Sequence, residues 1–402
     1  MIKNLILLNN SVNFKSEPFL RQEFNFIQKE NLSIFFNSSE TEGSWVNLTP
    51  SQSLIQVDKQ NLQLRIFIKH NWKLILNAWL LAFIKSPMRF NYLKNYKKYF
   101  NIWMGWLQEA KAWEEILKQF DPKDTIIYTY WYEQQANALT VLRAQGKLPF
   151  KWVSRAHGYD VDKRQRVENL IPFRHWMLKH APDDLVSISN FGANVFKNDY
   201  SAAVKIAKLG TPDLGLGAEP IENNALSLVS ISNIIPLKRV HLIIDILSKT
   251  KSSITWTHYG DGPIAEVLNW NNLPENIQLI RKGHITHERL LEELKTTPFD
   301  LMLHFSEFEG IPVSIMECMS LGIPVMACDT GGVAEIVNDE NGWLLPVNLD
   351  FVQVAKTIDY LAENRGLLQS KRDLARQTWE KEYQAKVNFP SFIQTYLMHP
   401  NN

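Results

Sequence analysis

The sequence predicts an α/β fold of two Rossmann-like domains, for three reasons. The chain has 402 residues, which is enough for two to three domains at about 150 residues each. Short apolar runs alternate with helical patterns, which is typical of parallel sheets covered by helices on both faces. A stretch rich in glycine and proline, residues 209–220, separates the two halves. We expect the functional site in the cleft between the domains.

The first domain is expected to span residues 1–211. Its strands are predicted at residues 2–8, 32–36, 125–130, 152–156 and 185–189. Its helices are predicted at residues 18–30, 133–145 and 192–200. Residues 37–63 are predicted to be irregular. The region up to residue 108 is predicted to be helical with a break near Ser86, because proline disfavours helix at the preceding residue.

The second domain is expected to span residues 212–385, and its alternation is more regular. Strands are predicted at residues 225–231, 254–259, 277–280, 301–305, 324–327 and 343–345. Helices are predicted at residues 238–248, 264–268, 287–294, 313–320, 333–337 and 351–362. The remaining segment, residues 386–402, can cross back to the first domain.

Composition excludes several classes of protein. The 43 basic and 42 acidic residues nearly cancel, whereas a dedicated nucleic-acid binder has a large basic excess. Hydrophobic residues make up 45% of the chain, which argues against wholesale disorder. Cys318 and Cys328 are too few for a disulfide framework or a four-cysteine zinc site, so a reducing compartment is the simplest interpretation. The apolar run Leu5–Leu8 is too short for a signal peptide, and no apolar stretch reaches the roughly 18 residues of a spanning helix.

Residues 59–108 form a basic segment rich in Trp, Tyr and Phe. They contain nine Lys and Arg residues and no Asp or Glu, although the whole chain has a net charge of only +1. This composition suits the surface of an anionic membrane, where each cation is worth about 1 kcal/mol and aromatic rings lie at the headgroup level. Two alternatives are ordinary helices with aromatic residues in the core and lysines in water, and a binding site for an anionic substrate.

The most specific stretch is residues 306–337, which contain two glutamates, Glu309 and Glu317, eight positions apart. A helix is predicted to begin at about Val313, so its first N–H groups and its dipole would attract an anion. Two carboxylates repel a diphosphate, but they fit the neutral sugars at the two ends of a nucleotide-sugar. Glu317 could accept hydrogen bonds from two ribose hydroxyls. The alternative is that both are surface acids.

The sequence EGIPVSIMECMSLGIPV at residues 309–325 resembles the signature of the retaining GT-B glycosyltransferases of family 4. The resemblance is to the group that builds bacterial surface polysaccharides of the exopolysaccharide, O-antigen and colanic-acid types. It covers most of the chain and is strongest from residue 225 to residue 345. It implies the GT-B architecture, in which two Rossmann-like domains face each other across a cleft, with the acceptor on the first domain and the nucleotide-sugar on the second.

The resemblance assigns roles to this stretch. Glu317 would bind the nucleotide ribose and Glu309 would contact the donor sugar as a catalytic residue. The backbone that follows would supply N–H or shape contacts, at Gly310, Ile311, Pro312 and Val313. Pro312 has no N–H to donate.

The resemblance also assigns Lys238 as the cation that binds the diphosphate. In the family an arginine commonly stands five residues earlier and completes a two-cation clamp, but this chain has Asn233 there. Asn233 can form hydrogen bonds to the donor but cannot neutralise its charge. Arg239 is the candidate that compensates, although neighbouring helical residues point about 100° apart.

Two glycine turns are expected to contact the donor. Gly260, Asp261 and Gly262 resemble the family's GDGP turn, which has a partly structural role. Gly283, His284 and Ile285 match a turn whose main chain contacts the base in the family.

In the first half, His157 resembles the histidine of the family's HGxD segment, which lies beside the donor sugar as a catalytic residue. The sequence Asp160-Val161-Asp162 has the form of a metal motif from a different glycosyltransferase fold. The resemblance implies that no metal and no other cofactor is needed, because Lys238 and the helix dipole stabilise the leaving diphosphate. Near the N-terminus, Glu23 and the residues before it resemble the loop and helix near the acceptor.

We therefore expect a retaining, metal-independent glycosyltransferase that moves a sugar from a UDP- or GDP-sugar to a lipid-linked or oligosaccharide acceptor in cell-surface polysaccharide biosynthesis. It would lie in the cytoplasm, peripheral on the inner face of the membrane, and bind the anionic surface through residues 59–108. Nucleic acid is not an expected partner. The alternatives are a nucleotide-sugar epimerase of the same fold and a non-catalytic scaffold of a polysaccharide-assembly complex. The sequence leaves open the donor base, the sugar, the acceptor and the oligomeric state.

Overall fold

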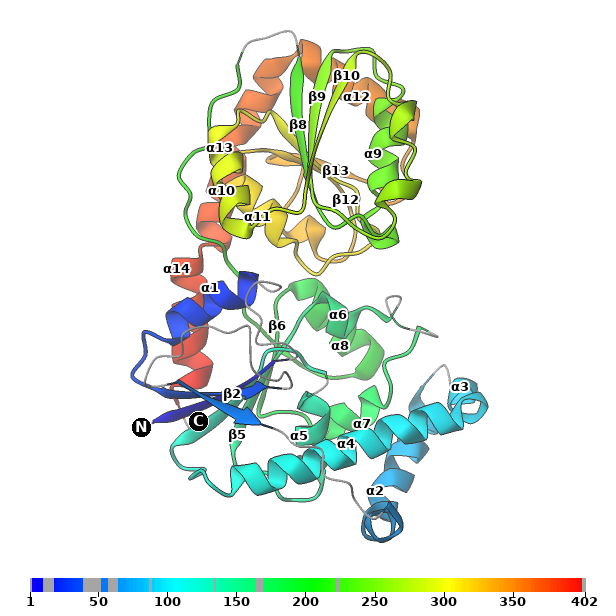
Figure 1. The fold of residues 1–402 in the computed structure, drawn as a ribbon, viewed down its shortest axis with the longest axis vertical. Helices are drawn as coiled ribbons and strands as arrows, with labels where there is room; N and C mark the ends of the chain where they lie inside the picture. Colours follow the sequence, from blue (N-terminus) through cyan, green and yellow to red (C-terminus); the bar gives the residue numbers. More distant parts are fainter. Residues whose placement is uncertain are drawn as a thin grey trace. The chain divides into compact units, whose positions relative to one another are not determined.

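The computed structural model describes residues 2–9, 18–38, 52–56, 64–86, 89–133, 135–163, 166, 169–221 and 225–399. The chain divides into two compact units, each with its own parallel sheet (Figure 1). The first unit comprises Met1–Ala207 with Pro390–Asn402, and the second comprises Lys208–Phe389. The chain returns to the first unit within the helix α14 (Ala385–Phe392).

The first unit has a seven-stranded sheet in the order β3-β2-β1-β4-β5-β6-β7. Its strands are β1 (Asn4–Leu8), β2 (Ser33–Ser38), β3 (Gln52–Gln56), β4 (Thr125–Thr129), β5 (Lys151–Ala156), β6 (Asp184–Ser187) and β7 (Lys205–Ile206). Its helices are α1 (Pro18–Ile27), α2 (Leu64–Lys85), α3 (Arg89–Lys94), α4 (Tyr96–Leu117), α5 (Gln135–Ala144), α6 (Gly158–Val161), α7 (Arg174–Lys179), α8 (Asn190–Tyr200) and the π-helical turn η7 (Ile393–Leu397).

The second unit has a six-stranded sheet in the order β10-β9-β8-β11-β12-β13. Its strands are β8 (Leu226–Ile231), β9 (Ile254–Tyr259), β10 (Ile277–Gly283), β11 (Leu301–His304), β12 (Val325–Cys328) and β13 (Gly342–Leu345). Its helices are α9 (Val240–Leu247), α10 (His287–Thr296), α11 (Val313–Ser320), α12 (Phe351–Glu363) and α13 (Arg365–Glu382), with 3-10 turns η3 (Pro236–Lys238), η4 (Ala265–Val267), η5 (Trp270–Asn272) and η6 (Val333–Glu335).

The predicted α/β class is confirmed, and all strand pairings between these elements are parallel. In the second unit, α9 and α12 cover one face of the sheet and α10, α11 and α13 cover the other (Figure 1). In the first unit, α4 and α5 supply much of one core, while α1 and the returning chain close the core on the other face.

One prediction about an element was wrong, and one long helix was missed. Residues 52–56, which we expected to be irregular, form the edge strand β3. An edge strand pairs on one side only, so Gln-Ser-Leu-Ile-Gln lacks the long apolar run of a central strand. The helix α13 was not predicted, because a charged side chain, Arg372, interrupts its inward-facing row of Leu368, Ala375 and Trp379.

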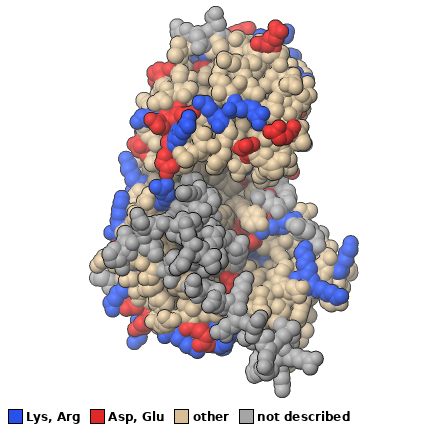
Figure 2. All heavy atoms as spheres, in the orientation of Figure 1, with Lys and Arg blue, Asp and Glu red and all other residues tan. Residues whose placement is uncertain are grey.

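The basic aromatic segment divides into an inner and an outer part. On α4, Tyr99, Trp103 and Trp106 are buried in the core, which agrees with the interpretation of ordinary helices for that part. On α2, α3 and the start of α4, large apolar side chains are exposed instead. This α2–α3 surface consists of Trp72, Leu76, Leu80, Phe83, Ile84, Phe90, Leu93 and Tyr96. Figure 2 shows blue side chains gathered at the corner where Figure 1 places α3.

Within the described parts of the chain, none of the helices is long and apolar enough to cross a membrane. Lys59, which belongs to the predicted basic segment, lies outside the described residues, as do the side chains of Arg65, Lys69 and Arg89.

Candidate active site

The predicted donor residues of the second unit lie at the carboxyl ends of its parallel strands. The strand β8 is followed in the sheet by β9 and β10 on one side, and β11 is followed by β12 and β13 on the other. The connections from β8 and β11 therefore run in opposite directions, and the crevice between such loops is the usual ligand site of an open α/β sheet. Lys238 lies in the loop after β8 and Glu309 lies in the loop after β11.

Lys238 and Glu309 form an ion pair at this edge of the sheet. The Lys238 Nζ lies 2.5 Å from Glu309 Oε1, and His304 Nε2 lies 3.1 Å from the same oxygen. On the other side, Ser306 Oγ is 3.1 Å from the same His304 Nε2. Burial alone would raise the pKa of Glu309, but Lys238 and His304 outweigh it and hold the pKa well below its usual range. Glu309 is therefore an anion with a cation beside it.

A glycine turn after β12 fixes the backbone of Glu309. Gly332 donates its N–H to the Glu309 carbonyl over 3.1 Å. A Cβ added at Gly331 would lie 1.8 Å from the Glu309 carbonyl oxygen, and one at Gly332 would lie 1.9 Å from that of Gly310. Gly331 also has a φ of +58°, which favours glycine. Only glycines allow this contact, and our sequence reasoning assigned the turn no role.

The loop after Glu309 leads into α11. Ile311 is buried, and Pro312 occupies the position before the helix begins at Val313, as predicted. The first N–H groups of α11 lack partners within the helix, so they are available to an anion.

The loop after β8 rests on the Gly-Asp-Gly turn after β9. A Cβ at Gly260 would lie 2.0 Å from the Ser232 carbonyl oxygen, and one at Gly262 would lie 2.3 Å from that of Ile234. Both glycines therefore let the loop that carries Asn233 pack directly on this turn. Asn233 itself is exposed to solvent.

The other members of these turns have mainly local contacts. The Asp261 carbonyl accepts a hydrogen bond from Ile234 N–H over 2.9 Å, and the Gly283 carbonyl accepts one from Gly260 N–H over 2.9 Å. His284 is exposed, and Ile285 is partly buried. Their contact with a nucleotide base stays a prediction.

Arg239 does not fit the role that we expected for it. Its guanidinium donates to the carbonyls of Phe305 at 2.7 Å, Val347 at 3.1 Å and Ser306 at 3.3 Å. A contact of 3.3 Å to Cys328 Sγ occupies it further. Its backbone is left-handed, with a φ of +48°, so the side chain leaves the direction that a continuous helix would give. Arg239 ties the loops together and is not placed to replace the missing arginine at Asn233.

Glu317 is on the inner side of α11, and its side chain is 3% exposed. Its Oε1 lies 2.6 Å from Nε2 of His287, the first residue of α10. His287 is a partner that our sequence reasoning missed, because nothing in the pattern links positions 30 residues apart. It orients the carboxylate that we expected to bind ribose.

In the first unit, His157 follows β5 and precedes α6. Its ring lies between those of Tyr130 and Trp131, with centroids 4.6 and 4.5 Å away, and the backbone N–H of His157 donates to Asp160 Oδ2 over 2.9 Å. Burial first, and then the charge of Arg155, hold the pKa of His157 well below its usual range. The imidazole is therefore neutral at physiological pH, which suits hydrogen bonding better than proton transfer.

Glu23 points into the core of the first unit and not to its surface. Its side chain is fully buried, where it accepts a hydrogen bond from the Tyr128 hydroxyl over 2.8 Å and lies 3.4 Å from Arg155. Arg155 in turn lies 3.9 Å from the ring centroid of Phe392, on the returning chain. The network joins α1, β4, β5 and α14, so Glu23 has a structural role. Ser16 and Glu17, which belonged to the same expectation, lie outside the described residues.

Comparison with known proteins agrees with this geometry. Residues 217–389 match the family model "Glycosyl transferases group 1". The chain is 26% identical over 223 residues to WcaL of Escherichia coli K12, which is named as a colanic acid biosynthesis glycosyltransferase. That similarity covers 52% of this chain and 54% of WcaL, so the chain spans about half the length of this relative.

Solved structures share the whole fold at low sequence identity. HepE from Anabaena, solved with UDP and glucose, has a TM-score of 0.65 at 14% identity and covers 98% of this chain and 99% of its own. TarM from Staphylococcus aureus, solved as a mutant with Fondaparinux, alpha-GlcNAc-glycerol and UDP, has a TM-score of 0.67 at 11% identity, over 98% of this chain and 100% of its own. Residues 217–389 thus resemble the glycosyl transferases group 1 family, and the chain has the GT-B fold.

Proposed function

We propose that this chain is a glycosyltransferase that moves a sugar from a nucleotide-diphosphate sugar to a glycan during the synthesis of a cell-surface polysaccharide. The Lys238–Glu309 ion pair carries this proposal, because it has a cation at the carboxyl edge of the second sheet, in the loops that lead to α11. The names of the relatives support it: WcaL is named for colanic acid biosynthesis, and HepE was solved with UDP and glucose.

Lys238 and the first N–H groups of α11 stabilise the negative charge that develops on the leaving diphosphate. Lys238 must leave Glu309 to do this, and Glu309 then binds hydroxyls of the donor sugar. Asn233 adds a neutral hydrogen bond where an arginine is absent. The charge on the diphosphate is thus balanced by Lys238 and the helix dipole and needs no metal ion, and transfer is expected to persist in EDTA.

Glu317 binds the ribose, with His287 fixing its orientation. We further propose that transfer retains the anomeric configuration through a front-face substitution, in which the departing phosphate helps to deprotonate the acceptor hydroxyl. His157, as a neutral imidazole, orients hydroxyls of the sugar.

The acceptor in this proposal is a lipid-linked glycan on the inner face of the cytoplasmic membrane. The α2–α3 surface supports this, because it joins exposed apolar side chains to the exposed lysines Lys94, Lys97 and Lys98. Apolar and aromatic groups enter the headgroup region of a bilayer, and lysines bind its anionic lipids.

A donor screen tests the function. The chain is mixed in turn with UDP- and GDP-sugars, thermal stabilisation is measured, and each stabilising donor is then incubated with and without lipid-linked oligosaccharide. Sugar transfer to the acceptor supports the proposal. Release of an epimerised sugar without acceptor identifies an epimerase, and failure of every donor to stabilise the chain points to a scaffold. In Glu317→Ala, donor binding measured by calorimetry is expected to be lost.

A further inference from the structure

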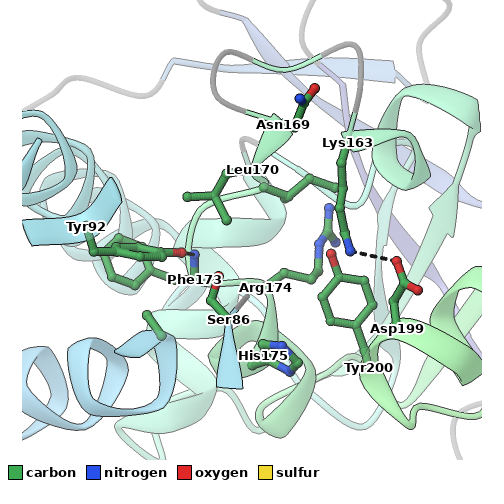
Figure 3. A pocket seen from close by; sticks show the side chains of 12 residues that line it. Ser86, Tyr92, Lys163, Asn169, Leu170, Phe173, Arg174, His175, Asp199 and Tyr200 are labelled. Atoms are coloured by element: carbon green, nitrogen blue, oxygen red, sulfur yellow. Dashed lines mark hydrogen bonds and ion pairs between the residues drawn. The ribbon is translucent and has the colours of Figure 1, made fainter. Parts of the chain in front are cut away.

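The first unit contains a cavity that the proposed reaction does not use. Its volume is about 150 Å³, and Figure 3 shows the side chains that line it. They come from the end of α2, from α3, from residues 163–175 and from the end of α8. A space of this size holds roughly one six-membered ring or one phosphate group with a few carbon atoms.

One wall of the cavity is apolar and rigid. Tyr92, Leu170 and Phe173 lie together on one side of the view in Figure 3, and Ala82 of α2 also lines the cavity. The Tyr92 hydroxyl accepts a hydrogen bond from Phe173 N–H over 2.8 Å, which fixes its ring. The ring centroids of Tyr92 and Phe173 are 5.2 Å apart. This wall can receive the hydrocarbon part of a ligand.

The opposite wall carries charge. Figure 3 shows Lys163, Asp199 and Tyr200 on this side, with 2.6 Å between Lys163 Nζ and Asp199 Oδ2. Arg174 is buried and donates to the carbonyls of Tyr132 at 3.2 Å and Asp160 at 3.0 Å. Its Nη2 also lies 3.4 Å from Glu133 Oε1, and its buried Nε–H has no hydrogen-bond partner among the described residues. Such a group favours an incoming acceptor.

Among the described residues, positive charge predominates around this wall. The surrounding cations are Lys85, Lys163, Arg166 and Arg174, and the carboxylates are Glu133, Asp160 and Asp199. Burial and the neighbouring Glu133 raise the pKa of Asp160 to about 7, so its negative charge is incomplete at neutral pH. Burial and then the charges of Lys163 and Lys85 lower the pKa of His175. This direction agrees with a positive potential, which disfavours the protonated imidazole. An anionic group therefore suits this wall.

The cavity lies behind the α2–α3 surface. Ala82 of α2 and Ser86, which follows this helix, line the cavity, while Leu80, Phe83 and Ile84 of α2 are exposed. The short helix α3 has the same arrangement, since Tyr92 lines the cavity while Phe90 and Leu93 are exposed. A ligand that joins an anion to a hydrocarbon chain matches both the cavity and the surface in front of it.

We propose that this cavity binds the phosphate group of a membrane amphiphile. The phosphate lies at Lys163 and Arg174, displacing Asp199 from Lys163, and the first carbons of the apolar part lie against Tyr92 and Leu170. The volume excludes a whole lipid, so the remaining chain stays in the bilayer beside α2 and α3. This binding requires neither nucleotide nor sugar, so it stands or falls separately from the proposed transfer.

Binding to soluble probes tests the proposal without a bilayer. Calorimetry on the full chain compares a monomeric short-chain phosphatidic acid, inorganic phosphate and the matching short-chain diacylglycerol. The variants are Lys163→Gln, which removes the cation, and Asp199→Asn, which removes its competitor. Lys197→Gln is the control. Lys197 is an exposed lysine of α8, the helix that carries Asp199, but it does not line the cavity. Thermal denaturation shows that each variant is folded.

We expect the phosphatidic acid to bind more tightly than the other two probes. Lys163→Gln should weaken its binding about tenfold, which is the worth of one charge-assisted hydrogen bond, and Asp199→Asn should tighten it about threefold. Lys197→Gln should leave it unchanged. Equal binding by wild type and both cavity variants would overturn the proposal. So would inorganic phosphate binding as tightly as the phosphatidic acid, since the site would then be one for an unattached phosphate.

Discussion

Lys238 must leave Glu309 before it can bind a diphosphate, and this exchange leads to an unusual prediction for Glu309→Gln. Glutamine keeps the size of the side chain but removes the charge that now lies 2.5 Å from Lys238 Nζ. Lys238 then loses its strongest competitor. We expect Glu309→Gln to bind UDP more tightly than the wild type while its sugar transfer falls, because in the proposed reaction the carboxylate binds the donor sugar.

The magnitude follows from the ion pair. Two unit charges 2.5 Å apart attract by about 6.6 kcal/mol at an effective dielectric constant of about 20, which is an upper limit. The side chains are 22% and 12% exposed, so water screens part of this attraction. A charge-assisted hydrogen bond has a net worth of about 1.5–3 kcal/mol. The lower value corresponds to roughly tenfold tighter binding of UDP in Glu309→Gln and roughly tenfold weaker binding in Lys238→Gln.

Calorimetric titration with UDP alone measures both effects without turnover. Glu307→Gln is the matched control, since it makes the same chemical change at an exposed residue of the same loop. Its affinity for UDP should equal that of the wild type. If Glu309→Gln binds UDP as weakly as Lys238→Gln does, Glu309 supports the nucleotide directly and the exchange of partners is refuted.

Three further predictions concern the glycine turn, the response to acid and the membrane. Gly331→Ala should lower the free energy of unfolding by at least about 2 kcal/mol in urea denaturation, because its Cβ would lie 1.8 Å from the Glu309 carbonyl oxygen. The control Gly366→Ala, with open space around it, should be neutral or stabilising, and equal effects of the two substitutions would refute the packing role. Burial lowers the pKa of His258 to about 4, so the unfolded chain takes up a proton first as the pH falls, and about 3 kcal/mol of stability should be lost between about pH 6.5 and pH 4. Urea denaturation of His258→Gln at the two pH values should lack this loss, and an equal loss in both proteins would contradict the prediction. Changing Lys94, Lys97 and Lys98 to Gln should weaken the affinity for anionic vesicles, measured by sedimentation, roughly 100-fold at about 1 kcal/mol per lysine. The control variant changes the exposed Lys29, Lys123 and Lys179 to Gln and should have little effect. Equal binding by wild type and the first variant would refute the membrane surface.

The parts of the site that were predictable lie close together in sequence. Glu309, Val313 and Glu317 belong to one loop and one helix, and the helix α11 has the predicted bounds. A buried parallel strand is a continuous apolar run, so the strand before this loop was also clear. Lys238 follows the strand β8, and the parallel sheet then brings it to the same edge as Glu309.

The parts that were not predictable depend on contacts between distant residues. The partnership of His287 with Glu317 joins two helices, and the close contact of Gly331 with Glu309 joins two loops. Neither leaves a local pattern in the sequence. The prediction for Arg239 assumed a continuous helix, but its left-handed backbone turns the side chain toward the carbonyls of the neighbouring loops.

The basic aromatic segment shows a limit of composition. Its aromatic residues looked alike in the sequence, yet Trp103 on α4 is buried and Phe90 on α3 is exposed. Which side of a helix is covered depends on how α2, α3 and α4 pack, and the mixed spacing of apolar residues did not specify this. The membrane prediction is therefore restricted to the α2–α3 surface, where it stays a prediction.

A crystal structure of the chain with bound UDP is the most direct test of how the donor is held. We predict that Lys238 Nζ will have left Glu309 and will lie within about 3 Å of a diphosphate oxygen, with the ribose beside Glu317. UDP bound away from the loops after β8 and β11, or a Lys238 that still pairs with Glu309 while UDP is present, would contradict the assignment of this site.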